Sequence, residues 1–331
     1  LGIGLMVIFL VHLIPYKVYS PLSPLLLYIA IPLLLVTLLF GTNINQATRW
    51  LEIPGLGVTI QTSDFAKLAL VVYVARILSL KQNYIKDLRR TFFPLVIPIS
   101  VVCLLILPAN FSTALMLALV CWIMLFVGRV SLKHLLGFSG LAIALVGLFV
   151  FIALQTNSVN RVQTWKNRVE GFSSGKVDVN YQAQQSKIAI ATGGLVGKGP
   201  GNSTQRNMLP HPYSDFIYAI IIEEYGLMGG VIVLFFYMVL LFRAGLIIKK
   251  ARRTFPAFLA MGLTLLLVFQ AMVNMAVAVN LIPVTGQPLP LVSMGGTSLL
   301  FTSASFGILL SISRSQNKEE LFDGEDPQDN N

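Results

Sequence analysis

Charged residues are scarce in this sequence, and their scarcity excludes an ordinary soluble domain. Only 11% of the 331 residues are Asp, Glu, Lys or Arg, whereas 55% are apolar. A soluble globular domain carries about 25% charged residues. Runs of about 20 mainly apolar residues, the length that crosses a bilayer, recur along the chain. The composition therefore predicts a polytopic membrane protein.

Cysteine is almost absent, which argues against a disulfide framework. The two cysteines, Cys103 and Cys121, both lie inside apolar runs. Small buried thiols are expected there as packing residues rather than as a disulfide or as metal ligands. No secretory signal with a cleavage site is visible. No cluster of metal-ligating residues is evident either, so no metal site is predicted.

The apolar runs predict an all-α fold with about nine transmembrane helices. They lie at roughly 1–14, 21–40, 64–80, 92–107, 111–128, 134–154, 229–247, 256–281 and 290–313. The expected division is an N-terminal group of helices (1–154), a long loop (155–215), a C-terminal group of helices (216–313) and a tail (314–331). The tail is polar, acidic and without periodicity, so it is predicted to be disordered.

Lys and Arg set the expected orientation of these helices. They gather in alternate short loops, whereas the opposite short loops hold almost only Arg49. Because short cytoplasmic loops carry an excess of Lys and Arg, the first set is predicted to be cytoplasmic. The loop 155–215 and the chain's first residue then lie outside, and the C-terminus lies inside.

The outer loop 155–215 is unusually long and basic, with Arg161, Lys187 and Arg206 among its cations. Two interpretations stay open: a solvated surface facing anionic headgroups, or a site for a phosphorylated lipid. Residues 181–190 are predicted to form an amphipathic helix. The glycine-rich stretch 193–199 that follows is either a plain turn or a place where backbone N–H groups approach a phosphate.

A second outer segment joins Arg49 to the start of the predicted helix at residue 64. Ser63 or Asp64 would cap that helix, and Asp64 would pair with Lys67 on the same face. The alternative is that Lys67 enters a polar cavity, since a lysine one turn into a membrane helix is costly unless it faces protein or water.

Asp215 stands where the polar loop meets a strongly apolar run. From local evidence alone it is a helix cap or a functional carboxylate. The run after it is too long for one span, so we expect a short helix with Glu223 and Glu224, a break near 226–230, and then the span. One glutamate is expected to pair with an inward cation, with Lys67 as the candidate.

The last outer loop, 280–298, carries two proline-bounded turns, a Gly-Gly pair and the hydroxyls of Thr285 and Ser293. Irregular backbone at membrane depth must be buried in protein or line a wet cavity. This segment is therefore predicted to form a cavity wall.

In this order and spacing, the motifs resemble the SEDS family of bacterial membrane proteins, whose best-known members are RodA and FtsW. The matching pieces are Arg49-Trp50, residues 63–67, Tyr181-Gln-x-x-Gln-Ser, the glycines of 193–199, residues 209–217, Glu223-Glu224-x-Gly226, residues 283–290 and Ser293-x-Gly-Gly. The similarity covers residues 1 to 315. Family members have ten spans, so the first is expected to be missing from this sequence.

The resemblance implies a peptidoglycan glycosyltransferase that polymerises lipid II at the outer face of the bacterial cytoplasmic membrane. It implies a class B penicillin-binding protein as partner, with other division or elongation proteins, and no nucleic acid. The family's essential aspartate falls on Asp215, and its lysine one turn into the earlier helix falls on Lys67. The loop favours the FtsW-like role in division over the RodA-like role in elongation.

Joining a sugar hydroxyl to an anomeric carbon that bears a pyrophosphate needs one general base and counter-charges. One well-placed carboxylate suits an inverting single displacement, because a nucleophilic carboxylate is needed only in retaining schemes. The hypothesis makes Asp215 the base and makes five cations the pyrophosphate ligands: Arg49, Lys67, Arg161, Lys187 and Arg206. Asp64, Glu223, Glu224, Thr285 and Ser293 are supporting residues. A divalent cation, Mg²⁺ or Mn²⁺, is compatible with this scheme. The alternatives are a lipid II flippase or transporter and a non-catalytic scaffold of the division site.

Overall fold

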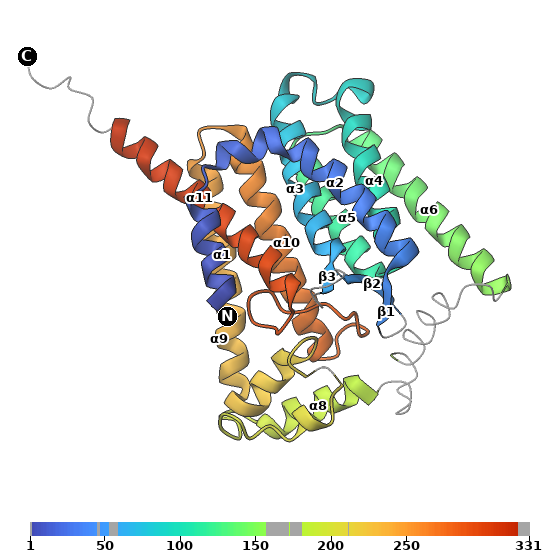
Figure 1. Cartoon of the computed structure of the whole chain (residues 1–331), viewed down its shortest axis with the longest axis vertical. Helices are drawn as coiled ribbons and strands as arrows, with labels where there is room; N and C mark the ends of the chain where they lie inside the picture. The colour runs from blue at the N-terminus through green and yellow to red at the C-terminus, as the bar shows by residue number, and fades with distance from the viewer. Residues whose placement is uncertain are drawn as a thin grey trace, which may run out of the picture. The chain divides into compact units, whose positions relative to one another are not determined.

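The computed structural model describes residues 2–44, 47–52, 59–156, 172, 181–210 and 212–323 (Figure 1). Helices dominate, which confirms the predicted all-α membrane class. The chain divides into two compact units. The first comprises residues 1–130, 239–267 and 296–331, and the second comprises residues 131–238 and 268–295.

A helix forms at each of the nine predicted spans. Their bounds are α1 Gly2–Leu13, α2 Tyr19–Phe40, α3 Thr62–Leu80, α4 Phe93–Ile106, α5 Phe111–Val127, α6 Leu132–Thr156, α9 Ile217–Lys250, α10 Thr254–Ala278 and α11 Thr297–Asp323. The helix predicted in the long loop is α8, Tyr181–Gly193.

Not every one of these helices is apolar enough to face lipid along its length. In the described part of the chain, four stretches are long and apolar enough to cross a membrane: Tyr16–Phe40, Leu88–Ile106, Ile217–Lys250 and Thr254–Ala278. Gly2–Leu13, Phe111–Val127 and Leu132–Leu148 are shorter apolar helices. Helix α3 falls outside both groups, and it buries Asp64 and Lys67 within the first unit.

In the first unit, α1 lies beside α11, although the two are far apart in the sequence (Figure 1). Small residues permit this close packing, since a Cβ added at Gly4 would meet the Ser303 hydroxyl at 3.0 Å. Two hydrogen bonds close the far end of the pair. The Ser311 hydroxyl donates to the Ile14 carbonyl at 2.6 Å, and the Arg314 guanidinium donates to the Leu13 carbonyl at 3.0 Å.

A small antiparallel sheet, absent from the sequence prediction, connects α2 to α3. Its strands are β1 Thr42–Ile44, β2 Ala47–Glu52 and β3 Thr59–Gln61, in the order β1-β2-β3. Trp50 pairs with both Thr42 and Gln61. The Gln61 N–H donates to the Thr297 hydroxyl at 3.1 Å, so the sheet holds the starts of α3 and α11 together. Strands this short leave little periodicity to detect.

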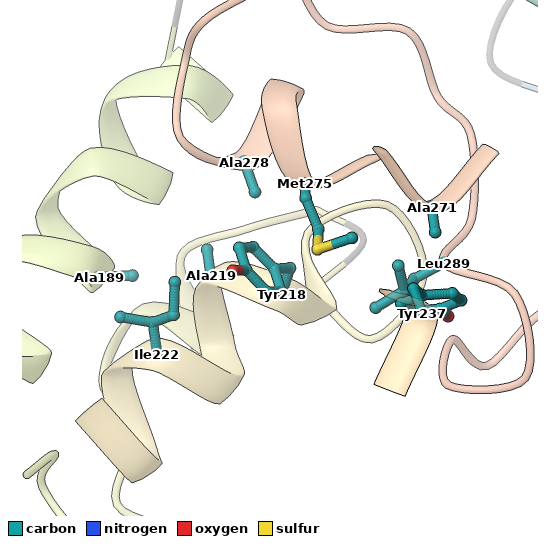
Figure 2. Close-up of a cluster of buried hydrophobic side chains, with 9 residues drawn as sticks. All are labelled: Ala189, Tyr218, Ala219, Ile222, Tyr237, Ala271, Met275, Ala278 and Leu289. Atoms are coloured by element: carbon teal, nitrogen blue, oxygen red, sulfur yellow. The ribbon is translucent and has the colours of Figure 1, made fainter. Parts of the chain in front are cut away.

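The second unit has its own apolar core, where α8, the first turns of α9 and the end of α10 meet. Figure 2 shows Ala189, Tyr218, Ile222 and Met275 converging there. The buried Ser186 hydroxyl of α8 also donates to the last carbonyl of α10, that of Ala278, at 2.6 Å.

Helix α9 breaks at Gly226, as predicted. Gly226 has φ 70° and ψ −174° inside an otherwise helical run. This region of the backbone map is open almost only to glycine. The break separates the short segment that carries Glu223 and Glu224 from the membrane-spanning part of the helix.

The C-terminal tail differs from its prediction. Helix α11 continues to Asp323, so the residues from 314 to 323 are helical rather than disordered. Lys318, Glu319 and Glu320 are strong helix formers, and they extend a helix that the first unit has already nucleated. Residues 324–331 lie outside the described part of the chain.

Candidate functional site

Asp215 sits on a turn that the second unit anchors just ahead of α9. The next residue, Phe216, is 1% exposed and packs with Leu209, Ile220 and Val277 in a small apolar cluster. Phe216 and Leu209 thus bury the two ends of the segment 209–216. The Asp215 side chain is half-buried.

Two buried polar side chains hold the backbone of the Asp215 turn. The Asn274 amide of α10 donates to the Asp215 carbonyl at 2.8 Å and to the Gln287 carbonyl at 2.7 Å. The Ser293 hydroxyl donates to the Ser214 carbonyl at 2.6 Å and accepts from the Leu289 N–H at 2.7 Å. Each side chain therefore joins the turn to the loop 279–295.

The loop 279–295 is itself fixed to two helices. Gln270 of α10 donates to the Pro288 carbonyl at 3.0 Å, and the Tyr237 hydroxyl of α9 donates to the Pro290 carbonyl. The Met294 N–H returns to the Tyr213 carbonyl at 2.8 Å. The predicted wall segment is thus an ordered support for the Asp215 turn, and Ser293 is one of its direct contacts.

Asp215 lies next to a hydroxyl donor and close to the start of a helix. The Ser214 hydroxyl donates to Oδ1 of Asp215 at 3.1 Å. Helix α9 begins at Ile217, two residues later, and the N-terminus of a helix carries a partial positive charge. The helix-cap and functional-carboxylate interpretations of Asp215 both stay predictions.

Glu223 is the most heavily bonded carboxylate in the described residues of the second unit. It is fully buried and pairs with Lys198 at 2.5 Å. Its two oxygens also accept from the hydroxyls of Ser203 and Thr204 and from the N–H groups of Thr204 and Gln205. A buried charge is tolerated when its lone pairs are satisfied in this way.

One glutamate pairs with a cation as expected, but the partner of Glu223 is Lys198 and not the candidate Lys67. Glu223 pairs with Lys198 from the loop, whereas Lys67 pairs with Asp64 at 2.6 Å. The physical reason is local geometry, since Asp64 and Lys67 are three residues apart on one helix and both side chains are buried. The capping prediction also fails, because α3 begins at Thr62 and places Ser63 and Asp64 inside its first turn.

The glycine-rich stretch 193–199 is not an open cradle for phosphate. The N–H groups of Gly197, Lys198 and Gly199 donate to the carbonyls of Gly193, Glu223 and Glu224, at 2.8, 3.0 and 2.9 Å. A Cβ at Gly193 would lie 2.1 Å from the Ile222 carbonyl oxygen. These glycines let two backbones touch, and the N–H groups of residues 197–199 are used in that contact rather than left open for a phosphate.

The five predicted pyrophosphate cations fall in different places. Lys67 belongs to the first unit, and so does Arg49, whose backbone lies in β2. Lys187 is exposed on α8, and Arg206 is half-buried in the 3₁₀ turn Gln205–Asn207 of the same unit as Asp215. Arg161 lies outside the described residues. Their role in binding stays a prediction.

The structure shows the surroundings of two predicted supporting residues, Thr285 and Glu224. The Thr285 hydroxyl is buried without a hydrogen-bond partner in the described residues, in the loop that supports Asp215. Glu224 is half-buried, and its carbonyl receives the Gly199 N–H. In the described ranges no group of three or more His, Cys, Asp or Glu side chains gathers in a way that suits a metal ion.

Sequence reasoning missed Asn274 and Gln270. Both are buried polar residues, four positions apart in the apolar helix α10, so they lie on one face. Polar side chains inside a membrane helix are costly unless they face protein or water, so they mark a contact inside the protein. Two polar residues four positions apart in an apolar run are the sequence signal that could have identified them.

Comparison with known proteins agrees with this architecture. A family model described as a cell cycle protein, FtsW/RodA/SpoVE, matches residues 1–318. Stage V sporulation protein E of Bacillus subtilis is 35% identical, covering 95% of this chain and 84% of its own length. Peptidoglycan glycosyltransferase MrdB of Escherichia coli is 34% identical, covering 94% and 83%.

Two solved structures are similar over nearly the whole chain. One is a chain of a peptidoglycan synthase complex that coordinates polymerization and crosslinking, with TM-score 0.75, 26% identity and coverage of 95% of this chain and 87% of that one. The other is the rod shape determining protein RodA of Thermus thermophilus, with TM-score 0.67, 25% identity and coverage of 95% and 85%. This multi-pass membrane chain therefore belongs to the FtsW/RodA/SpoVE family.

Proposed function

We propose that this protein is a peptidoglycan glycosyltransferase that polymerises lipid II, with Asp215 as general base. Relatives named peptidoglycan glycosyltransferase cover most of the chain and support the activity. The observation that supports the base is the anchored Asp215 turn, because its backbone is held by Asn274 and Ser293 while its carboxylate stays half-buried. A base must keep one position relative to its substrate.

The proposed reaction is a single displacement. Asp215 takes the proton of the acceptor sugar's 4-hydroxyl, and the hydroxyl oxygen bonds to the anomeric carbon of the donor. The bond from that carbon to the pyrophosphate oxygen breaks, and the lipid pyrophosphate leaves with the electron pair. Attack from the opposite face inverts the anomeric centre, and no covalent sugar–enzyme intermediate is needed.

The leaving pyrophosphate needs positive charge nearby. Arg206 belongs to the same unit as Asp215 and comes directly after the loop residues that bind Glu223. It is therefore the first candidate in that unit. Lys67, Arg49, Lys187 and Arg161 complete the proposed set. Mg²⁺ or Mn²⁺ would assist by the same charge neutralisation.

The proposed setting is the outer face of a bacterial cytoplasmic membrane. The Lys and Arg of the alternate loops favour the extracytoplasmic side for the Asp215 turn. A class B penicillin-binding protein is the proposed partner that crosslinks the glycan, in keeping with a similar structure from a complex that couples polymerization and crosslinking. The FtsW-like role in division is preferred to the RodA-like role in elongation.

The test is polymerisation of labelled lipid II by the purified protein with its penicillin-binding partner, in which transpeptidation is blocked by penicillin. Asp215→Asn should lower the rate by about 10²–10⁴-fold, the usual contribution of a general base. Asp87→Asn is the matched control, because Asp87 is an exposed carboxylate that accepts the N–H groups of Arg89 and Arg90.

Thermal unfolding of Asp215→Asn should match that of the wild type, since the backbone contacts of the turn remain. Polymer formed at the wild-type rate by this variant would refute the catalytic role. If the wild-type protein moves lipid II across the membrane but forms no polymer, the flippase alternative is favoured. If it does neither, a scaffold is favoured.

A further inference from the structure

The turn between α8 and the loop after it presents two aliphatic side chains to the outside. Leu195 is 70% exposed and Val196 is 84% exposed. Single exposed aliphatic residues are common on proteins and need no explanation. We call this pair the 195–196 tip. Its backbone contacts and its apolar neighbours on α9 distinguish it from an ordinary exposed pair.

The tip is held rigidly. Gly197 and Gly199 donate their N–H groups to carbonyls on either side, and the Leu227 N–H donates to the Gly194 carbonyl at 2.9 Å. A Cβ at Gly226 would lie 2.2 Å from the Leu195 carbonyl oxygen, so the two backbones are in contact. Because these contacts fix the backbone of the tip, the side chains of Leu195 and Val196 remain exposed on the surface.

The tip continues an exposed apolar surface that begins on α9. Across the break at Gly226, Leu227 is 49% exposed and Met228 is 64% exposed, and they open the membrane-spanning part of the helix. The hydrogen bond from the Leu227 N–H to the Gly194 carbonyl places the tip at the same height along α9 as this first turn. The surface that α9 offers to lipid therefore extends without interruption onto the tip.

The length of α9 places this surface at the edge of the hydrocarbon core. The part of the helix from Leu227 to Lys249 rises about 34 Å at about 1.5 Å per residue, against a core of about 30 Å. With Lys249 and Lys250 at one interface, Leu227 reaches the other. Tyr225, 50% exposed just before the break, has the amphipathic ring that favours such an interface.

We propose that the 195–196 tip inserts into the acyl-chain boundary of the outer leaflet and anchors the loop that follows it. The occupant of this surface is lipid, because the tip shares the level and the apolar character of the lipid-facing start of the α9 span. Lys198 and the loop 199–207 remain above the bilayer, with Glu223 fixing them to the helix. The inference rests on the membrane fold and is independent of the proposed catalytic role of Asp215.

The test uses Val196→Cys and, separately, Leu195→Cys, each labelled with the environment-sensitive dye NBD in a protein whose Cys103 and Cys121 are replaced by Ala. The proteins are placed in nanodiscs of phosphatidylethanolamine and phosphatidylglycerol, with or without lipids that carry a nitroxide near the headgroup. Asn202→Cys is the matched control, since Asn202 is an exposed polar residue of the loop above.

Labels at 195 and 196 should emit at shorter wavelength than the label at 202, should be quenched several-fold more by the nitroxide lipid, and should resist aqueous iodide. Equal iodide quenching at 196 and 202 would overturn the proposal. Protection that appears only after the penicillin-binding partner is added would overturn it as well, by assigning the tip to a protein. Thermal unfolding of the labelled proteins that matches the unlabelled protein would show that the fold is intact.

Discussion

Replacing Glu223 by Gln should loosen the loop 198–207 without touching the Asp215 turn. The Glu223 carboxylate is fully buried and accepts hydrogen bonds through both oxygens. Glutamine has one acceptor and one donor end. Whichever way the amide lies, its NH₂ group meets an N–H donor, either that of Thr204 or that of Gln205.

The size of the effect follows from this geometry. Removing one member of a buried ion pair costs about 3–5 kcal/mol. The Lys198 side chain is 28% exposed, so water solvates part of its charge once Glu223 is neutral. We therefore expect a loss of about 2–4 kcal/mol in the free energy that holds the loop closed.

Amide hydrogen exchange of the reconstituted protein measures this free energy locally. Exchange of the N–H groups of Thr204 and Gln205 should rise about 30- to 1000-fold in Glu223→Gln, because every 1.4 kcal/mol is tenfold in an opening constant. Glu224→Gln is the matched control, as the neighbouring half-buried residue contributes its carbonyl rather than its side chain to this contact. Equal exchange in the two variants would refute the view that the buried carboxylate holds the loop.

Two further predictions concern contacts on either side of this loop. Gly193→Ala should lower the melting temperature clearly more than Gly194→Ala does, because a Cβ at Gly193 would lie 2.1 Å from the Ile222 carbonyl oxygen. A Cβ at Gly194 meets no atom within 4 Å, so Gly194→Ala should cost only about 1–2 kcal/mol for its positive φ. Equal melting temperatures of the two variants would contradict this. Asn274→Asp should lower lipid II polymerisation at least about tenfold, because a carboxylate would face the carbonyls of Asp215 and Gln287 in place of a donor. Asn274→Asp with wild-type activity would show that this contact does not position Asp215.

The sequence predicted most of the helices because they follow apolar runs, and bilayer thickness sets the length expected of a span. The break at Gly226 was also predictable, since the run from Phe216 to Phe242 exceeds one span. The sheet of β1 to β3 was not, because its strands are too short to show alternation. Tertiary pairing, rather than local propensity, forms them.

The candidate site was predictable only in part. The position of Asp215 followed from the meeting of a polar loop and an apolar run, but its supports did not, because Asn274 and Ser293 act on backbone carbonyls. The cation that pairs with Glu223 was not the candidate expected for one of the glutamates, for a related reason. Lys198 is brought to it by three backbone contacts of a glycine turn, and no spacing rule encodes such contacts.

The pairing of α1 with α11 imposes a delay on membrane insertion. The Ser311 hydroxyl reaches the Ile14 carbonyl across 297 positions of sequence. At about 5–20 residues per second of synthesis, α1 waits about 15–60 seconds in the bilayer before its final neighbour exists. During that interval the small-residue face around Gly4 has no α11 to pack against. A nascent chain stalled before α11 would therefore hold α1 in the bilayer without the helix it packs against in the finished fold.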